Sequence, residues 1–171
     1  MVVTTLNGRE ALAECLSSLA ADAAPAEVIV VNGPSADGTT GMVRERDDVA
    51  VLLELADRNV NVARNAGAAA ATGDVVAFLD ARAAVEPGWR AAVVESVADG
   101  ADAVTGPVRY PMRVGTATTT PERERVGART VTHLSDGNVS FQRGALGRLD
   151  GFDEYLPVGG ERDAAHRIAG F

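Results

Sequence analysis

Five short apolar runs divide the first 108 residues of the chain. They span residues 2–6, 27–32, 49–55, 74–80 and 101–108. Nearly continuous apolar runs are typical of parallel strands that are buried on both faces of a sheet. The segments between them carry apolar residues at helical spacing, as Leu12, Leu16 and Leu19 do in the first segment. The alternation predicts an α/β fold, with an open, mostly parallel sheet, helices on both faces and right-handed crossovers.

The pattern changes after residue 108. Residues 109–136 are largely polar and show no clear period, which indicates a long loop excursion. Residues 137–143 then alternate as a strand, residues 144–149 suit a short helix, and residues 161–171 begin another helix. We interpret residues 1–171 as one domain. Because the chain stops inside its last helical pattern, we expect a shortened domain or a fragment of a longer protein.

The charged residues are unusual in kind. All 16 basic residues are arginine, and 24 acidic residues bring the formal net charge to -8. This composition favours a protein adapted to a salt-rich cytoplasm, as in a halophile; a GC-rich genome is the alternative explanation. An acidic surface repels phosphates, so we expect no nucleic-acid partner.

No apolar stretch reaches the roughly 20 residues of a membrane span, and we expect a cytoplasmic protein that works at the inner membrane surface.

Polar residues follow each of the first four predicted strands. They are Thr5 and Asn7, then Asn32, Ser35 and Asp37, then Asp57 and Asn59, then Asp80 and Arg82. The carboxyl ends of parallel strands meet at one edge of a sheet, so these loops are predicted to share a cleft. Taken singly, each residue also suits a turn or a helix cap, and Asn7 is a candidate N-cap for the first helix. Neither a GxGxxG nor a GxxxxGK[ST] loop is present.

Five segments of the chain resemble, in the same order, the motifs of family 2 glycosyltransferases. They are "VVTTLNGREALAECLSSL", "EVIVVNGPSADGT", "NVARNAGAAAATGDVVAFLD", "GNVSFQRGALGRLDGFDE" and "GGERDAAHRIAG". The resemblance implies a GT-A fold, which is related to the Rossmann fold. It also implies transfer of a sugar from a nucleotide-diphosphate sugar to a hydroxyl acceptor, a glycan or a lipid-linked sugar, with inversion. Residues 1–108 would then bind the donor, and residues 137–171 would form the acceptor side.

The resemblance also assigns residues to the nucleotide. In the family, the loops after the first two strands hold the base and ribose, and an "ARN" segment lies near the nucleotide. The residues at the matching positions are Thr5, Asn7, Asn32, Asp37 and Arg64. Asn32 stands where the family often has an acid, and its amide oxygen accepts hydrogen bonds without carrying charge. Helix packing is the alternative role for Arg64.

The family's D-x-D motif is altered in this chain. Asp80 matches the first acid, which in the family contacts the ribose and a divalent cation, Mg²⁺ or Mn²⁺. Arg82 stands in place of the second acid, and a guanidinium repels a cation rather than ligating it. One hypothesis is that Arg82 neutralises the diphosphate directly through bidentate hydrogen bonds. The other is that Arg82 belongs to a degenerate loop.

The family's general base is an acid at the start of a late helix, beside the acceptor. The motif places Glu161 at that position and Asp163 two residues later. A glutamate there is able to take the proton of the acceptor hydroxyl during transfer. The alternative is that both acids only stabilise a helix N-terminus. At the level of function, the alternative to an enzyme is a catalytically inactive domain that binds a nucleotide sugar or a partner.

Overall fold

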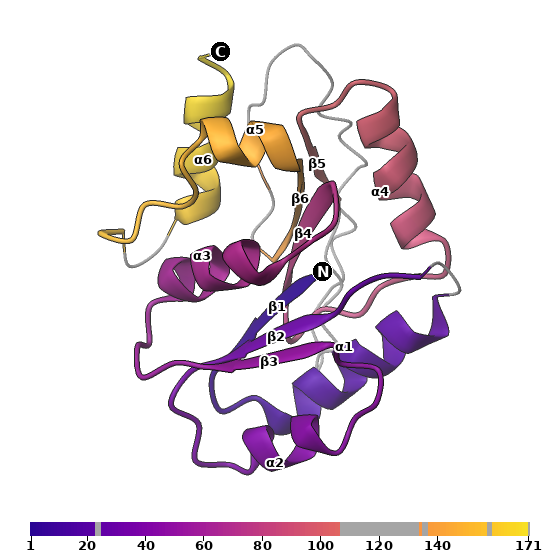
Figure 1. Cartoon of the computed structure of the whole chain (residues 1–171), viewed down its shortest axis with the longest axis vertical. Coiled ribbons are helices and arrows are strands. Elements are labelled where there is room, and N and C mark those ends of the chain that lie inside the picture. The colour runs from indigo at the N-terminus through magenta and orange to yellow at the C-terminus, as the bar shows by residue number, and fades with distance from the viewer. Residues whose placement is uncertain (23–24, 107–133, 135–136, 157–158, 171) are drawn as a thin grey trace, which may run out of the picture.

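The computed structural model describes residues 1–22, 25–106, 134, 137–156 and 159–170, and Figure 1 shows how its elements are arranged. The strands are β1 (Val2–Thr5), β2 (Ile29–Asn32), β3 (Val51–Glu54), β4 (Val75–Asp80), β5 (Ala103–Thr105) and β6 (Asn138–Gln142). The helices are α1 (Arg9–Ala21), α2 (Thr39–Arg44), α3 (Val60–Ala70), α4 (Trp89–Ala98), α5 (Arg143–Arg148) and α6 (Gly160–Ile168). Each predicted strand and helix is therefore confirmed within the described residues; the strands are shorter than predicted, and α5 and α6 each begin one residue earlier. The predicted excursion over residues 109–136 lies outside the described residues except for Leu134.

The strands form one six-stranded sheet in the order β3-β2-β1-β4-β6-β5. Strands β3, β2, β1 and β4 are parallel, and β6 runs antiparallel to both β4 and β5. The mostly parallel sheet is thus confirmed. The position of β6 between β4 and β5 was not predicted. Val139 and Phe141 of β6 are almost fully buried, so an inner position suits this strand better than an edge.

Helices cover both faces of the sheet, as predicted. Alternate strand residues point to opposite faces, so Val2 joins one apolar cluster and Val3 joins the other. The first cluster packs the sheet against α3, α5 and α6, and the second packs it against α1 and α2. Gly67 brings α3 close to the sheet, because a Cβ at this position would overlap the side chain of Val2.

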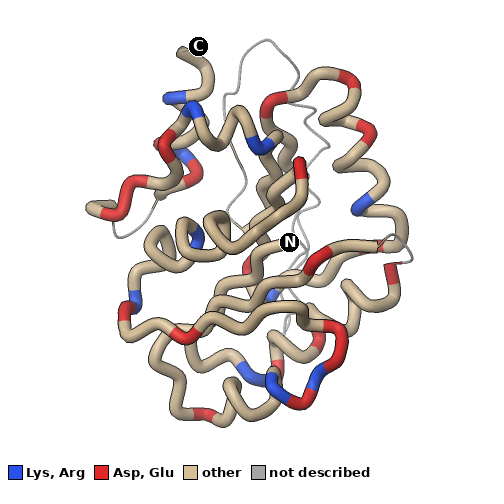
Figure 2. Tube along the Cα trace, in the orientation of Figure 1, with Lys and Arg blue, Asp and Glu red and all other residues tan. Residues whose placement is uncertain are grey.

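The register of the parallel strands brings polar residues together at their carboxyl edge. Thr5 pairs with Asn32, Asn32 pairs with Glu54, and Thr4 pairs with Asp80. Figure 2 shows that β1 and β2 carry no charged residue along their length. Charge therefore enters this part of the sheet only at the strand ends and in the loops that follow them. Within the described part of the chain, no helix combines the length and the apolar character needed to cross a bilayer.

Candidate functional site

At the end of β4, Asp80 binds Arg82 through both carboxylate oxygens. The Arg82 backbone N–H and its Nε donate to Oδ1 at 2.8 and 3.0 Å, and Nη2 donates to Oδ2 at 2.7 Å. The Asp80 side chain is 27% exposed and the Arg82 side chain is 68% exposed. The guanidinium therefore lies at the surface of the carboxyl edge, with its planar fork turned back onto the preceding acid.

Burial and charge act on Asp80 in opposite directions. Partial burial by itself raises the pKa of Asp80, but hydrogen bonds from Arg82 and the positive charges of Arg82 and Arg64 lower it, and lowering prevails. The carboxylate is therefore ionised near neutral pH. The charge of Arg64, on α3, is the smallest of these contributions.

The residues at this edge do not fit the divalent cation that the D-x-D motif holds in the family. Both oxygens of Asp80 bind a guanidinium, and the second position of the motif is a cation itself. Among the described residues, no group of three His, Cys, Asp or Glu side chains is arranged to hold a metal ion. Hard oxygen ligands, which Mg²⁺ and Mn²⁺ prefer, are thus not gathered around Asp80.

Cys15 lies on the α1 side of the sheet beneath Asp80. Its Sγ is 3.9 Å from the Asp80 carbonyl oxygen. Burial, followed by the negative charge of Asp80, raises the pKa of Cys15 to about 12. The thiol therefore stays protonated at neutral pH and is not a nucleophile.

On the other side of the sheet, Glu161 is buried in an ion pair with Arg64. Nη2 of Arg64 donates to Oε1 of Glu161, and the two side chains are only 10% and 4% exposed. Glu161 is in the first turn of α6, while Arg64 is in the middle of α3. The acid that the sequence assigns to the acceptor side thus lies against a residue that it assigns to the nucleotide. Both assignments remain predictions.

An aromatic cluster supports this ion pair. The Phe78 and Phe152 rings meet edge to face at 5.0 Å between centroids, and Phe141 lies 6.1 Å from each of them. The Arg64 Cζ lies 5.1 Å from the centroid of Phe152. A guanidinium at this distance over a ring gains a cation–π interaction, which is stronger where water is excluded. Arg64 therefore lies on a ring that contacts Phe78, two residues before Asp80 in β4.

Three asparagines of α3 or its N-cap bind the loop that leads to α6, and the sequence did not predict this role. The Nδ2 groups of Asn59, Asn61 and Asn65 donate to backbone oxygens of residues 152–156 at 2.7–3.0 Å. Gly160 permits this close approach, because a Cβ there would overlap the Asn61 amide. The only available signal was the density of asparagines near the start of this helix. The loop before Glu161 is thus attached to the helix that carries Arg64.

Asp163 has a different environment from Glu161. Its Oδ2 accepts from Nε of Arg167 at 2.7 Å, one helical turn later, and the side chain is 29% exposed. Arg167 also donates to the carbonyl oxygens of Leu149 and Gly151. Asp163 therefore orients an arginine that ties α6 to the end of α5.

Asn32 is buried and its amide is engaged within the loops. Nδ2 donates to Thr40 Oγ1 at 2.9 Å, and Oδ1 accepts from Ser35 Oγ at 2.7 Å. The neighbouring Thr5 has a buried Oγ1 for which the described part of the chain supplies no hydrogen-bond partner. Of the two predicted nucleotide contacts on the inner strands, Thr5 thus retains an unused polar atom, while Asn32 holds the loop in shape.

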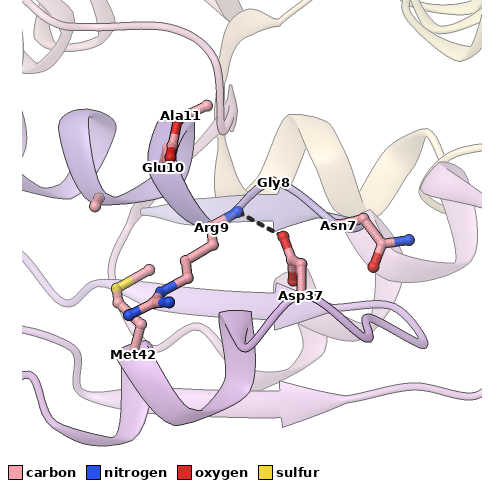
Figure 3. Close-up of a pocket in the computed structure, with 8 residues that line it drawn as sticks. Asn7, Gly8, Arg9, Glu10, Ala11, Asp37 and Met42 are labelled. Atoms are coloured by element: carbon pink, nitrogen blue, oxygen red, sulfur yellow. Dashed lines mark hydrogen bonds between the residues drawn. The ribbon is translucent and has the colours of Figure 1, made fainter.

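Asn7 and Asp37 join the loops after β1 and β2. The Asn7 Oδ1 accepts from the Ala36 N–H, and Asp37 Oδ2 accepts from the Arg9 N–H at 3.0 Å (Figure 3). Asp37 also accepts from Thr39 N–H at the start of α2. The prediction that Asn7 caps α1 is wrong, because Gly8 is the N-cap and Asp37 supplies the acceptor from a distant loop.

Beside these loops runs an open groove of about 820 Å³. Asn7, Arg9, Asp37 and Met42 are among its lining residues, and Figure 3 shows the side chain of Arg9, on α1, extending toward Met42, on α2. Most of the sequence-predicted residues divide into two groups. Asn7, Asn32 and Asp37 shape the loops after β1 and β2, whereas Asp80 with Arg82 and Arg64 with Glu161 form two ion pairs.

Known proteins resemble this chain in sequence and in fold. Residues 1–150 match the family described as Glycosyl transferase family 2. Glycosyltransferase AglE of Haloferax volcanii is 28% identical over 118 residues, which cover 64% of this chain and 39% of that protein. Mannosyltransferase PcManGT from Pyrobaculum calidifontis, in complex with GDP-Man and Mn²⁺, has a TM-score of 0.80 at 26% identity. S. aureus TarS 1-349 has a TM-score of 0.78 at 21% identity, which shows the fold alone.

The coverage of these matches is unequal. The structural matches cover 98% of this chain but 50% of the mannosyltransferase and 54% of TarS 1-349. The chain thus spans about half the length of those structures and 39% of the curated relative. Since the family match covers most of the chain and the neighbouring structures are GT-A glycosyltransferases, the chain belongs to glycosyl transferase family 2 and has the GT-A fold.

Proposed function

We propose that the protein transfers a sugar from a nucleotide-diphosphate sugar to a hydroxyl acceptor, with inversion at the sugar. The observation that carries this proposal is the arrangement of Asp80 and Glu161. Asp80 ends β4 at the edge where α/β sheets bind ligands, and Glu161 contacts Arg64, whose guanidinium lies on the Phe152 ring against Phe78 of β4. Asp80 would thus bind the donor, and Glu161 would serve as the base for the acceptor.

The proposed reaction is a single displacement. Glu161 takes the proton of the acceptor hydroxyl, and the acceptor oxygen bonds to the anomeric carbon. The bond between that carbon and the diphosphate breaks on the opposite side, and the nucleoside diphosphate leaves with the electron pair. Attack opposite the leaving group inverts the configuration. We assign the proton to Glu161 rather than Asp163, because the family motif places Glu161 at the position of the base.

Arg82 is proposed to contact the diphosphate. Negative charge grows on the diphosphate as the sugar leaves, and a cation already in place there lowers the barrier. Its guanidinium is exposed at the carboxyl edge and has the fork geometry that matches phosphate oxygens. In this role the guanidinium would supply positive charge at the diphosphate, whereas the structure of PcManGT contains Mn²⁺.

We propose the donor from the related proteins, and we propose a salt-rich cytoplasm from the composition. PcManGT was solved with GDP-Man and TarS with UDP-GlcNAc, which supports a nucleotide-diphosphate sugar as donor. We propose a glycan or lipid-linked sugar as acceptor, at the inner membrane surface. A salt-rich cytoplasm is supported by the net charge of -8 with no lysine.

The direct test is a thermal-shift series with UDP, GDP and dTDP sugars in concentrated KCl, with and without Mn²⁺. A ligand at 100 times its Kd stabilises a protein by about 2.7 kcal/mol, which is a measurable shift. Binding followed by release of nucleoside diphosphate in the presence of acceptor sugars supports the transferase. Binding without turnover supports the inactive sugar-nucleotide-binding domain instead, and no shift with any nucleotide contradicts both.

A further inference from the structure

We propose that Arg64 is a positioning residue that exchanges partners: it holds Glu161 in the donor-free protein and moves to the diphosphate when the donor binds beside Asp80. Glu161 is then released to act as a base only when the donor is in place. This inference rests on the proposed function, because it assumes a diphosphate at the end of β4. Its outcome is a binding order in which the donor precedes the acceptor.

The first argument is the state of Glu161. A general base needs an oxygen within hydrogen-bond reach of the hydroxyl that it deprotonates. Here the side chain is 4% exposed, and Oε1 is bound to Arg64. Removing a partner from a buried charge is costly, so Arg64 leaves only if another anion attracts it. A diphosphate is such an anion and carries more charge than a carboxylate.

The second argument is the position of Arg64 on α3. Gly67 packs over Val2 of β1, and Arg64 precedes Gly67 by three residues, or about 4.5 Å of helix rise. Because α3 follows the carboxyl end of β3, its earlier residues lie nearer the carboxyl edge of the sheet, where Asp80 pairs with Thr4. The guanidinium lies on Phe152, which in turn contacts Phe78, two residues before Asp80. A single aromatic ring, that of Phe152, thus lies between Arg64 and Phe78 of β4.

The third argument is the character of the two partners. Arginine binds phosphate oxygens in bidentate fashion, and a ring face below it remains a favourable surface while the side chain moves. Asn61 Oδ1, which accepts from Nη1 at 3.1 Å, is a neutral partner that holds the guanidinium only weakly. Among the described residues, the contact to Glu161 is therefore the principal charge contact of Arg64, and a diphosphate would compete with it.

The exchange predicts a measurable proton balance. A carboxylate that loses its opposite charge binds protons more readily. At mildly acidic pH, binding of a nucleoside diphosphate is therefore expected to take up as much as about one proton at Glu161. Isothermal titration of UDP and GDP in two buffers of different ionisation enthalpy measures this uptake without any turnover. Uptake in the wild type that disappears in Glu161→Gln supports the exchange.

Two matched variants control the experiment. Glu95→Gln removes an exposed carboxylate of α4 and should leave the uptake unchanged. Arg64→Lys keeps the charge but lacks the fork, and it should bind nucleotide more weakly and take up less proton than the wild type. Far-ultraviolet circular dichroism checks that each variant is folded.

The outcomes separate this inference from the proposed function. If the wild type binds no nucleotide, both fail. If the wild type binds nucleotide and transfers sugar, but its proton uptake equals that of Glu161→Gln, the exchange is wrong and the transferase stands. As a second readout, the acidic limb of the pH–rate profile should move to higher pH in Arg64→Lys; an unmoved limb also contradicts the exchange.

Discussion

The two arginine–carboxylate pairs of the candidate site differ in sequence separation and in burial. Arg82 and Asp80 are two residues apart, and their side chains are 68% and 27% exposed. Arg64 and Glu161 are 97 residues apart, with side chains only 10% and 4% exposed. Both pairs join the same chemical groups, so the comparison isolates the effect of their surroundings.

The surroundings decide what each pair contributes. An exposed ion pair is weak, typically 0–1 kcal/mol, because water and salt screen it and the side chains lose freedom. A buried pair stabilises little compared with apolar residues, but removing one partner strands the other charge. The Arg82–Asp80 pair is therefore suited to opening for a ligand from solvent. The Arg64–Glu161 pair opens only when another anion replaces the carboxylate.

The largest expected effect is on stability. Glu161→Ala strands Arg64 inside the protein, so the free energy of unfolding is expected to fall by about 3–5 kcal/mol. Arg82→Ala should lower it by no more than about 1 kcal/mol. Guanidinium chloride unfolding measures both, and the Arg64→Met, Glu161→Leu double variant should recover most of the loss. Equal losses for Glu161→Ala and Arg82→Ala would remove the distinction between the pairs.

The next effect is on turnover at the exposed pair. Arg82→Ala is expected to lower kcat about 10²–10³-fold, the scale on which loss of one preorganised charge donor acts. The control is Arg46→Gln, which removes an arginine paired with Asp48 on the surface and should leave kcat unchanged. Wild-type turnover should persist in EDTA, whereas Arg82→Asp should respond to Mn²⁺, since it restores two acids. A wild-type requirement for Mn²⁺ contradicts the role of Arg82.

The buried pair is tested by Glu161→Gln, which keeps the shape of the side chain. Turnover should fall about 10²-fold because the proton acceptor is lost. Donor affinity should not fall, since a neutral amide no longer competes with the diphosphate for Arg64. Steady-state kinetics with titration of the donor separates the two quantities. The same loss in Asp163→Asn alone would transfer the role of base to Asp163.

A smaller effect distinguishes the pairs by pH. The pKa of Asp80 is lowered below the ordinary value of 3.8, so its contribution to stability is present above that value and is lost as the pH falls through the folded-state pKa. Arg82→Ala removes the side-chain hydrogen bonds and the charge of Arg82 but keeps the backbone hydrogen bond and the effect of burial, so the pKa of Asp80 should rise. A carbon-detected NMR titration of the Asp80 carboxyl follows this change. An unaltered titration would show that Arg82 does not bind Asp80 in solution.

The smallest expected effect is the response to salt. The small loss of stability in Arg82→Ala should vanish in about 1 M KCl, where the screening length is near 3 Å. The loss in Glu161→Ala should persist, because a buried pair is screened far less. Unfolding curves of both variants at low and high KCl make the comparison. Parallel salt dependence in the two variants would place both pairs in similar surroundings.

Much of the architecture followed from local pattern. Continuous apolar runs indicated the strands, and the spacing of Leu12, Leu16 and Leu19 indicated α1, whose leucines are buried as expected. The position of Asp80 at the end of β4 also followed, because a strand that is buried along its length exposes its first polar residue where it ends. The replacement of an acid by Arg82 was visible directly. Each of these inferences depends only on residues that are close in the chain.

The tertiary structure decided the rest. No local pattern indicated that β6 lies between β4 and β5, that Asp37 rather than Asn7 binds the first turn of α1, or that Arg64 meets Glu161. These contacts depend on which helix packs against which part of the sheet, and residues 97 positions apart share no sequence period. Burial acts in the same way: Glu161 becomes an ion-paired core residue only when α6 is attached to α3. The sequence by itself determined which chemical groups were available, and packing determined which of them meet.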